Sequence, residues 1–484
     1  MTNFIKLYYF NTRLVAQGFS QRPGVHFKET FAPVARLSSI RLLASIAAQY
    51  DMNIRQFDVT CAYLNGELEE EIFMEPPKYL LQVLEMIQSE EDREVGDKAR
   101  KMLKQLREGD HVCLLKKSLY GLRQAGRSWY AKLDGILRRF GAVPTKADPC
   151  VYRIGTGEDS TLIAIYVDDI IVASRDPRMA DRLFNCLSQK FETSDLGEIG
   201  YCLGMEFNRT LGAINILQTG YINELLKRFG MFDSKPVCAP LDPGVKLLKS
   251  EEPPDENLPY RELVGALTYL STATRPDISF AVSYLGQFNN CYGKPHWTAA
   301  KRVLRYLKGT TKLGLTFFKK SQFLEGFVDA DWGNCPNDRK SFTGYVFMLG
   351  GGPVSWDARK QKTVALSSTE AEYMGLAEAT KEASYLRSFL IELGLDNLSS
   401  VVVYEDNLGA LKLAANPTFH NRSKHIDIKY HFIRDAVKEK ILSLSHVSSA
   451  EMVADVLTKG LPGSRHQRCV RELGLCRAAE TCRD

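Results

Sequence analysis

The fold is decided by TLIAIYVDDIIVAS (161–174), the clearest pair of strands in the sequence. Two short apolar runs flank a turn that contains Asp168 and Asp169. Adjacent carboxylates repel one another, so such a pair in an apolar setting needs a cation. Taken alone, the pair fits a plain hairpin turn equally well, because Asp is a common turn residue.

A third carboxylate on a neighbouring strand would complete a metal site with this turn. Asp58 is the best candidate, because it lies in IRQFDVTCAYLNG (54–66), which alternates like a strand and ends in an Asn-Gly turn. Three carboxylates that bind two Mg²⁺ ions roughly 3.5–4 Å apart serve phosphoryl transfer. One ion activates a hydroxyl and the other stabilises the leaving oxygen. The sequence therefore predicts a two-metal site for Mg²⁺, in which Mn²⁺ can substitute.

Hydrophobic periodicity divides the rest of the chain into helical and extended segments. Helices are expected at 41–50, within 80–108, and at 128–141 and 178–191, and a strand at 203–207. A linker rich in Pro, Asp and Glu (234–259) is followed by helices at 259–272, 277–289 and 296–308. Strands at 323–329, 342–349 and 400–405, with helices at 369–393 and 407–414, indicate a separate α/β domain after residue 320.

Length and composition bound the remaining possibilities. The 484 residues, of which 44% are hydrophobic, are too many for one compact core and suggest two to four domains. A formal net charge of +5 neither requires nor excludes nucleic acid. The 11 cysteines form no C-x-x-C pair, which favours reduced thiols in an intracellular protein. We find no signal peptide and no transmembrane segment, and we expect no contact with a membrane.

The helix expected at 296–308 carries a basic face. Lys301, Arg305 and Lys308 are spaced i, i+4 and i+7, whereas the apolar residues of this helix turn the other way. Such a face suits contacts with nucleic-acid phosphates. A solvated helix face is the alternative, and on charge alone it is favoured by roughly two to one.

Four acidic residues in the last third of the chain lie at or near expected element boundaries: Asp329, Glu370, Asp406 and Asp455. Such carboxylates can again bind two Mg²⁺ ions, here to activate a water molecule for hydrolysis of a phosphodiester. Spacing alone is weak support, because the chain has 58 acidic residues. Ser367 and Glu370 also fit a capping box at the start of a helix, which is a purely structural role.

Many longer motifs resemble the reverse transcriptase and RNase H of copia-type retrotransposons, in family order from about Arg13 to Lys459. In the first part these motifs are FAPVARLSSIRLL, QFDVTCAYLNGELEEEIFMEPP, LKKSLYGLRQAGRSWY, YVDD, LGEIGYCLGMEF, TRPDISFAVS and HWTAAKRVLRYLKGT. In the last third they are DADW, LSSTEAEY, YEDN, NRSKHIDIKYHFIRD and ADVLTK.

The resemblance implies an α+β fold, a right-hand polymerase with fingers, palm and helical thumb followed by an α/β RNase H-like domain. The expected domains are the fingers and palm (1–200), the primer grip, linker and helical thumb or connection (201–320), the RNase H-like domain (321–462) and a C-terminal tail (463–484). Residues 78–110 are longer and more charged than the usual link, and Gly126 replaces a usual proline.

The resemblance also implies roles for single residues. Asp58, Asp168 and Asp169 match the palm carboxylates, and Asp329, Glu370, Asp406 and Asp455 match the metal-binding carboxylates of the RNase H centre. Tyr63 matches a ring that excludes ribonucleotides, Arg13 and Gln124 match nucleotide-binding positions, and Gly204 and Met205 match the turn that grips the primer. His446 matches the place of a product-releasing histidine.

Ordinary structural roles are the alternatives for several of these residues. They are a core tyrosine for Tyr63, a polar residue at a helix start for Gln124, a simple hairpin for the 204–205 turn and a surface histidine for His446. His425 and His431 are spaced poorly for one metal and are interpreted as structural.

By this resemblance the chain is an RNA-directed DNA polymerase, a nucleotidyltransferase, with RNase H activity and two Mg²⁺ ions in each active site. Its partners would be an RNA template, a DNA primer, an RNA–DNA hybrid, deoxynucleoside triphosphates and other parts of the polyprotein, in cytoplasmic particles with access to the nucleus. The alternatives are a decayed nucleic-acid-binding remnant and a metal-dependent nuclease only. The intact carboxylates favour the enzyme, whereas the few residues before Arg13 favour the remnant.

Overall fold

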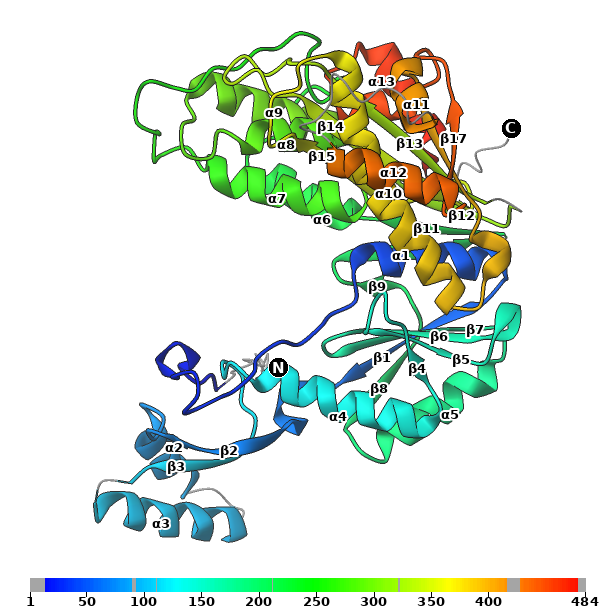
Figure 1. The fold of residues 1–484 in the computed structure, drawn as a ribbon. Helices are drawn as coiled ribbons and strands as arrows, with labels where there is room; N and C mark the ends of the chain where they lie inside the picture. Colours follow the sequence, from blue (N-terminus) through cyan, green and yellow to red (C-terminus); the bar gives the residue numbers. More distant parts are fainter. Residues whose placement is uncertain are drawn as a thin grey trace, which may run out of the picture. The chain divides into compact units, whose positions relative to one another are not determined.

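The computed structural model describes residues 14–88, 93–109, 111–210, 212–320, 323–415 and 427–477 (Figure 1). The chain forms two compact units. The first consists of residues up to 34, 58–142 and 185–194, and the second of residues 35–57, 143–184 and those from 195 onward. Helices and strands occur together in both, which confirms the α+β class. Among the described residues, no helix is both long and apolar enough to cross a lipid bilayer.

Helix α4 (Ala125–Phe140) is the main helix of the first unit. It buries Trp129, Leu133 and Leu137, which recur every four residues and therefore share one face. Gly141, with a φ of +99°, ends the helix in the left-handed conformation that glycine favours. The helix starts three residues earlier than the periodicity of 128–141 predicts.

The same unit contains a two-stranded sheet of β2 (Glu67–Met74) and β3 (Cys113–Lys117). Between these strands lie α2 (Leu80–Ile87) and α3 (Arg93–Arg107). The two helices pack against one another through Leu84, Ala99 and Leu103. The charged segment is therefore helical, as its sequence predicts.

A six-stranded sheet, in the order β4-β5-β6-β7-β1-β8, lies mostly in the second unit. Its strands are β1 (Asn53–Val59), β4 (Val143–Pro144), β5 (Val151–Ile154), β6 (Thr161–Tyr166), β7 (Asp169–Ser174) and β8 (Thr193–Glu198). β6 and β7 are the predicted strand pair, and nearly all their residues are buried. Helix α1 (Leu37–Gln49) packs on both strands. Helix α5 (Pro177–Ser188) contacts β1 through Phe184 and Phe57.

A five-stranded antiparallel sheet in the order β18-β12-β11-β10-β9 also belongs to this unit. Its strands are β9 (Tyr201–Cys202), β10 (Met205–Thr210), β11 (Ala213–Leu217), β12 (Leu313–Phe318) and β18 (Leu475–Arg477). Helix α13 (Gly463–Glu472) precedes β18. The expectation of a tail from residue 463 is therefore corrected, because Leu475 and Cys476 are buried in this sheet.

Four α-helices lie between β11 and β12 in the sequence: α6 (Thr219–Arg228), α7 (Tyr260–Ala273), α8 (Ser279–Gly286) and α9 (Lys294–Gly309). They share one apolar core, to which α9 contributes Val303, Leu304 and Leu307. In the described chain, no helix or strand forms between α6 and α7, as expected of a linker.

The third sheet has the order β15-β14-β13-β16-β17. Its strands are β13 (Leu324–Ala330), β14 (Phe342–Leu349), β15 (Gly352–Lys360), β16 (Val401–Glu405) and β17 (Ser443–His446). β16 runs parallel to both β13 and β17, whereas β14 is antiparallel to its neighbours. The helices are α10 (Ser368–Glu392), α11 (Leu408–Ala415) and α12 (Asp427–Lys438), and α10 packs on β13 and β14. The predicted mixture of strands and helices is present, with β15 as an additional strand.

A buried polar network joins α9 and α13 to a short helix (Pro276–Ile278) that precedes α8. The Arg275 guanidinium donates to the two carboxylate oxygens of Asp277 at 2.9 and 2.7 Å, and the Tyr306 hydroxyl donates to the same carboxylate at 2.6 Å. His466 packs edge-on against the Tyr306 ring. A charge pair is tolerated at complete burial because its hydrogen bonds are satisfied.

His466 makes the stability of this unit sensitive to acid. Burial lowers the pKa of His466 to about 4, below the value near 6.5 of an exposed histidine. Between these pH values the unfolded chain binds more protons than the folded chain, so stability falls as the pH falls. We expect His466→Leu to reduce the loss of unfolding free energy between pH 7 and pH 4 by up to about 3 kcal/mol. Urea unfolding at both pH values measures this loss, with His446→Leu at an exposed site as control; equal losses in the two variants would contradict the prediction.

Candidate active sites

The first candidate site is the hairpin between β6 and β7. Tyr166 pairs with Asp169 in register, so Val167 and Asp168 form a two-residue turn. Val167 has a φ of +57°, a left-handed conformation that a β-branched residue rarely adopts. Backbone strain of this kind is concentrated at functional sites, where the surrounding structure maintains it. The turn places two adjacent carboxylates at the end of two buried strands.

Gln56 of β1 fixes one of these carboxylates. Its Nε2 donates to Asp169 Oδ1 at 2.7 Å, and the Gln56 side chain is buried. Reasoning from sequence missed this residue, although it lies in the alternating stretch that contains Asp58. Asp58 itself belongs to the first unit, whereas Asp168 and Asp169 belong to the second. The site of three carboxylates therefore stays a prediction.

The predicted primer-end turn is a hairpin between β9 and β10, in which Cys202 pairs with Met205. Leu203 and Gly204 have positive φ values of +50° and +70°. Glycine is required at position 204 for two reasons. Its φ is positive, and a Cβ at this position would collide with the Tyr269 hydroxyl. That hydroxyl donates to the carbonyl oxygen of Leu203. Helix α7 thus fixes the turn, and its role toward a primer stays a prediction.

Gln124 and Tyr63 have structural contacts within the first unit. The Gln124 amide donates to the His26 carbonyl and accepts from the Gln21 side chain, both at 3.0 Å. Tyr63 packs against Tyr120, with ring centroids 5.0 Å apart. Gln124 also lines a cavity of about 670 Å³, whose charged lining is mixed: the cations are Lys28, Arg127, Lys132 and Arg139, and the acids are Glu29, Glu67, Glu69 and Glu70. The roles toward a nucleotide stay predictions, and Arg13 lies outside the described residues.

The second candidate site is a group of carboxylates in the sheet that contains β13. Asp329 lies near the end of β13, Glu372 lies in α10, and Asp406 directly follows β16. One carboxylate oxygen of each residue lies within 4.8 Å of the others. Asp329 and Asp406 meet because β13 and β16 are parallel neighbours, whose carboxyl ends reach the same edge of the sheet. Helix α10 crosses this sheet and supplies the third carboxylate.

Glu370, the ligand expected from sequence, forms a helix cap instead. Its Oε2 accepts from the Leu366 backbone N–H at 2.8 Å, and its own N–H donates to Ser367 Oγ at 3.2 Å. This arrangement is the capping alternative. The assignment of Glu370 to the carboxylate group is therefore corrected to Glu372. An acidic residue one turn before the apolar Leu376, on the buried face of the helix, is the signal that could have identified it.

Lys459 links Asp455 to Asp329 of the carboxylate group. Asp455 lies in a short helix (Val453–Leu457) and is 1% exposed. Lys459 Nζ lies 2.6 Å from Asp455 Oδ1 and 3.3 Å from Asp329 Oδ2. Arg465 forms an ion pair with the other oxygen of Asp455. The Thr458 hydroxyl donates to Asp329 Oδ2, so that this carboxylate is fixed from the same segment.

The electrostatics of the group favour a divalent cation. Burial raises the pKa of Asp329, against the opposing charge of Lys459. Burial also raises the pKa of Glu372 well above its ordinary value, and the nearby charges of Asp329 and Glu405 add to the rise. Glu372 Oε2 is buried with no hydrogen-bond partner among the described residues. Hard cations such as Mg²⁺ bind carboxylate oxygens, so this donor set fits the expected metal.

Two of the three cations on the basic face of α9 contact the segment between α6 and α7. The Lys308 ammonium lies 4.1 Å from the centroid of the Phe232 ring, and Arg305 Nε donates to the Lys235 carbonyl at 2.8 Å. Lys301 lies beside the Trp297 ring. All three cations are half-buried, so a role in binding phosphates stays a prediction. His446 is exposed at the end of β17, whereas His425 and the His431 side chain lie outside the described residues.

Known proteins resemble the chain over long stretches. The family model described as reverse transcriptase (RNA-dependent DNA polymerase) matches residues 3–93 and 98–243. The chain is 40% identical to the retrovirus-related Pol polyprotein from transposon TNT 1-94 of Nicotiana tabacum, over 97% of this chain and 34% of that protein. It is 30% identical to the putative transposon Ty5-1 protein of Saccharomyces cerevisiae, over 67% of this chain and 99% of that protein.

A solved structure of the foamy viral protease-reverse transcriptase in complex with RNA/DNA hybrid covers 86% of this chain and 46% of that chain, with 10% identity and a TM-score of 0.46. The chain spans about a third of the length of the plant polyprotein that it matches, with 34% of that relative covered. The identity to both transposon proteins and the nearly complete coverage of the yeast protein show that the chain belongs to the reverse transcriptase family of the copia-type retrotransposon Pol polyproteins.

Proposed function

We propose that the chain is an RNA-directed DNA polymerase with RNase H activity, and that both centres use Mg²⁺. The observation that carries the proposal is the group formed by Asp329, Glu372 and Asp406 in a member of the reverse transcriptase family, and the adjacent Asp168 and Asp169 in a hairpin of another sheet support it. When bound, the divalent cations would activate an attacking hydroxyl or water and stabilise the leaving oxygen. The two sites would thus extend a DNA strand and remove the RNA strand paired with it.

In the polymerase centre, we assign the metal to Asp58, Asp168 and Asp169. The strained hairpin and the hydrogen bond from Gln56 position Asp169 before a substrate arrives. Because side chains alternate along a strand, Asp58 lies on the same face of β1 as Gln56. This alternation supports the inclusion of Asp58 with the two hairpin carboxylates.

In the hydrolytic centre, we assign the metal to Asp329, Glu372, Asp406 and Asp455. Thr458 orients Asp329 through its hydroxyl. Glu372 and Asp455 are almost completely buried, so water competes weakly for their oxygens and electrostatic interactions are strong. These carboxylates would direct a water molecule at a phosphodiester of the RNA strand.

The proposed substrates are an RNA template, a DNA primer, deoxynucleoside triphosphates and an RNA–DNA hybrid, and other parts of the polyprotein are proposed partners. In the cavity beside Gln124, Lys28 and Arg139 suit contacts with phosphates, whereas Arg127 and Lys132 form ion pairs with Glu29 and Glu67. Tyr63, the 204–205 turn and the basic face of α9 are the other proposed contacts, and His446 is proposed to assist product release.

Primer extension on an RNA template, together with cleavage of a labelled RNA–DNA hybrid, tests the proposed function. Both activities should appear with Mg²⁺ and disappear with EDTA. Binding of the hybrid without either reaction would indicate a non-catalytic remnant. Cleavage without extension would indicate a nuclease only, and the polymerase half of the proposal would be rejected.

Tyr63 is predicted to exclude ribonucleotides. Tyr63→Val removes the aromatic ring, and ribonucleotide incorporation relative to deoxynucleotide incorporation should rise roughly tenfold, as a loss of about 1.4 kcal/mol of discrimination would produce. Tyr63→Phe keeps the ring and its packing against Tyr120, and should keep the selectivity. Single-nucleotide incorporation kinetics measure both ratios. If the valine variant discriminates as the natural chain does, Tyr63 is a packing residue.

A further inference from the structure

Lys459 occupies an unusual place in the hydrolytic centre. Its ammonium lies 3.3 Å from Asp329 Oδ2 and 2.6 Å from Asp455 Oδ1, and the two carboxylate side chains are only 3% and 2% exposed. One ammonium therefore joins two buried carboxylates that the proposed function assigns to metal ions. One of these two carboxylates, Asp329, also lies close to Glu372 and Asp406.

So many carboxylates in one buried place need positive charge. Buried carboxylates that lack a cation are strongly destabilising, because desolvation and mutual repulsion act together. An ammonium is a compact charge on a flexible stem with three hydrogen-bond donors, so it can serve as a counter-ion. A divalent cation that binds the same oxygens of Asp329 and Asp455 must displace Lys459, since two cations cannot share that position.

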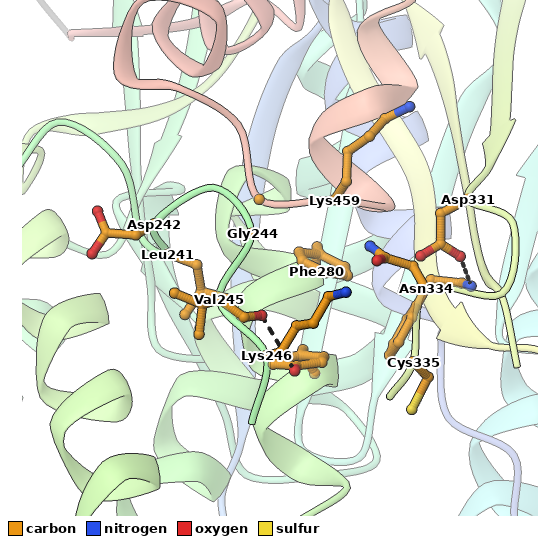
Figure 2. Close-up of a pocket in the computed structure, with 13 residues that line it drawn as sticks. Leu241, Asp242, Gly244, Val245, Lys246, Phe280, Asp331, Asn334, Cys335 and Lys459 are labelled. Carbon is orange, nitrogen blue, oxygen red and sulfur yellow. Dashed lines mark hydrogen bonds between the residues drawn. The ribbon is translucent and has the colours of Figure 1, made fainter. Parts of the chain in front are cut away.

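A cavity beside the centre offers the displaced ammonium another acceptor. The cavity has a volume of about 60 Å³, and both Lys459 and Asp331 line it (Figure 2). Asp331 Oδ1 accepts a hydrogen bond from the Phe342 backbone N–H. Asp331 Oδ2 is buried with no well-formed hydrogen bond in the described part of the chain, the Asn334 side chain lies near this carboxylate, and the residue is only 8% exposed. No role in the proposed chemistry accounts for this buried carboxylate.

We propose that Lys459 is a tethered counter-ion, which joins Asp329 to Asp455 in the metal-free protein and moves to Asp331 when a divalent cation binds. The proposal rests on the proposed hydrolytic function. Binding of the metal then becomes an exchange of cations. The exchange keeps the empty centre stable and weakens the apparent affinity for Mg²⁺, because the ion pairs of Lys459 must first be broken.

Calorimetric titration with Mg²⁺, in the absence of nucleic acid, tests the exchange. All proteins carry Asp168→Asn, so that metal bound at the polymerase carboxylates contributes little. Lys459→Gln should tighten the Mg²⁺ dissociation constant roughly tenfold or more, which corresponds to about 1.4 kcal/mol. It should also lower the melting temperature in EDTA, and Mg²⁺ should raise that temperature more than in the parent protein. An unchanged or weaker affinity would overturn the proposal.

Three further variants sharpen the result. Lys381→Gln removes a lysine that pairs with the partly exposed Glu378 on the same helix as Glu372, and should change neither affinity nor stability. Lys459→Arg retains the charge if the glutamine variant fails to fold without metal. This bulkier cation should bind Mg²⁺ no more tightly than the parent, and tighter binding would contradict the exchange. Asp331→Asn should weaken binding in the parent protein but not in Lys459→Gln, because the coupling requires the lysine.

A second assay distinguishes failure of this proposal from failure of the proposed hydrolytic function. It measures cleavage of an RNA–DNA hybrid by the protein that keeps Lys459 and Asp331. Cleavage together with unchanged Mg²⁺ affinity in Lys459→Gln rejects the counter-ion and keeps the hydrolytic function. Tighter Mg²⁺ binding in that variant without hybrid cleavage supports the counter-ion and rejects the hydrolytic function.

Discussion

Glu372→Gln is expected to stop cleavage of the RNA strand of a hybrid, with a loss of at least about a thousandfold, or about 4 kcal/mol of transition-state stabilisation. The substitution keeps the size of the side chain but removes the charge of a buried carboxylate that lies with Asp329 and Asp406. A neutral amide oxygen is a much weaker ligand for Mg²⁺ than a carboxylate. Primer extension should continue, because the polymerase carboxylates lie on another sheet.

Glu370→Gln is the matched control, since it makes the same chemical change two residues earlier in the same helix. A glutamine can still accept the hydrogen bond from the Leu366 N–H, so the helix cap is retained. Cleavage by this variant should remain within about threefold of the natural rate, a change of less than about 1 kcal/mol. The opposite pattern, with the loss in Glu370→Gln, would restore the assignment made from sequence and remove Glu372 from the centre.

The contrast between these two residues shows what the sequence can and cannot supply. The motif LSSTEAEY predicts the start of a helix and an acidic ligand near it, and both features are local. The choice between Glu370 and Glu372 depends on which face of α10 packs on β13, and this face is set by contacts between distant segments. Reading the capping box correctly would have assigned Glu370 to the helix cap.

Strands were predicted where apolar residues form short runs between turn signals, as in 161–174. β15 was missed because it begins at Gly352 and Pro353, residues that usually mark turns. β18 has only three residues and acquires its strand conformation from pairing with β12. A segment so short carries no periodicity from which a strand could be predicted.

Gln56 and Lys459 were missed for a related reason. Neither residue type suggests a catalytic centre, and each gains its importance from a carboxylate far away in the sequence. Gln56 reaches Asp169 across neighbouring strands, and Lys459 reaches Asp329 because its segment packs beside β13. Residues that position or neutralise a site are thus identified by three-dimensional contacts, whereas the carboxylates of the 161–174 hairpin are identified by their own sequence.

Asp168→Asn is expected to abolish DNA synthesis on an RNA template, with a loss of at least about a thousandfold in the rate of nucleotide incorporation. The side chain lies in a two-residue turn whose backbone conformation is set by Val167 and by the paired strands, so the isosteric amide should leave the hairpin intact. The substitution removes one negative charge beside Asp169, and with it a ligand for a divalent cation.

Asp159→Asn is the control. It removes the same charge from an exposed pair with Arg175, and this variant should synthesise DNA at the natural rate. Single-turnover incorporation separates the chemical step from primer binding, and hybrid cleavage by the same protein reports that the other centre is intact. Synthesis by Asp168→Asn at the rate of Asp159→Asn would exclude the hairpin from the polymerase centre, and the strain at Val167 would then need another explanation.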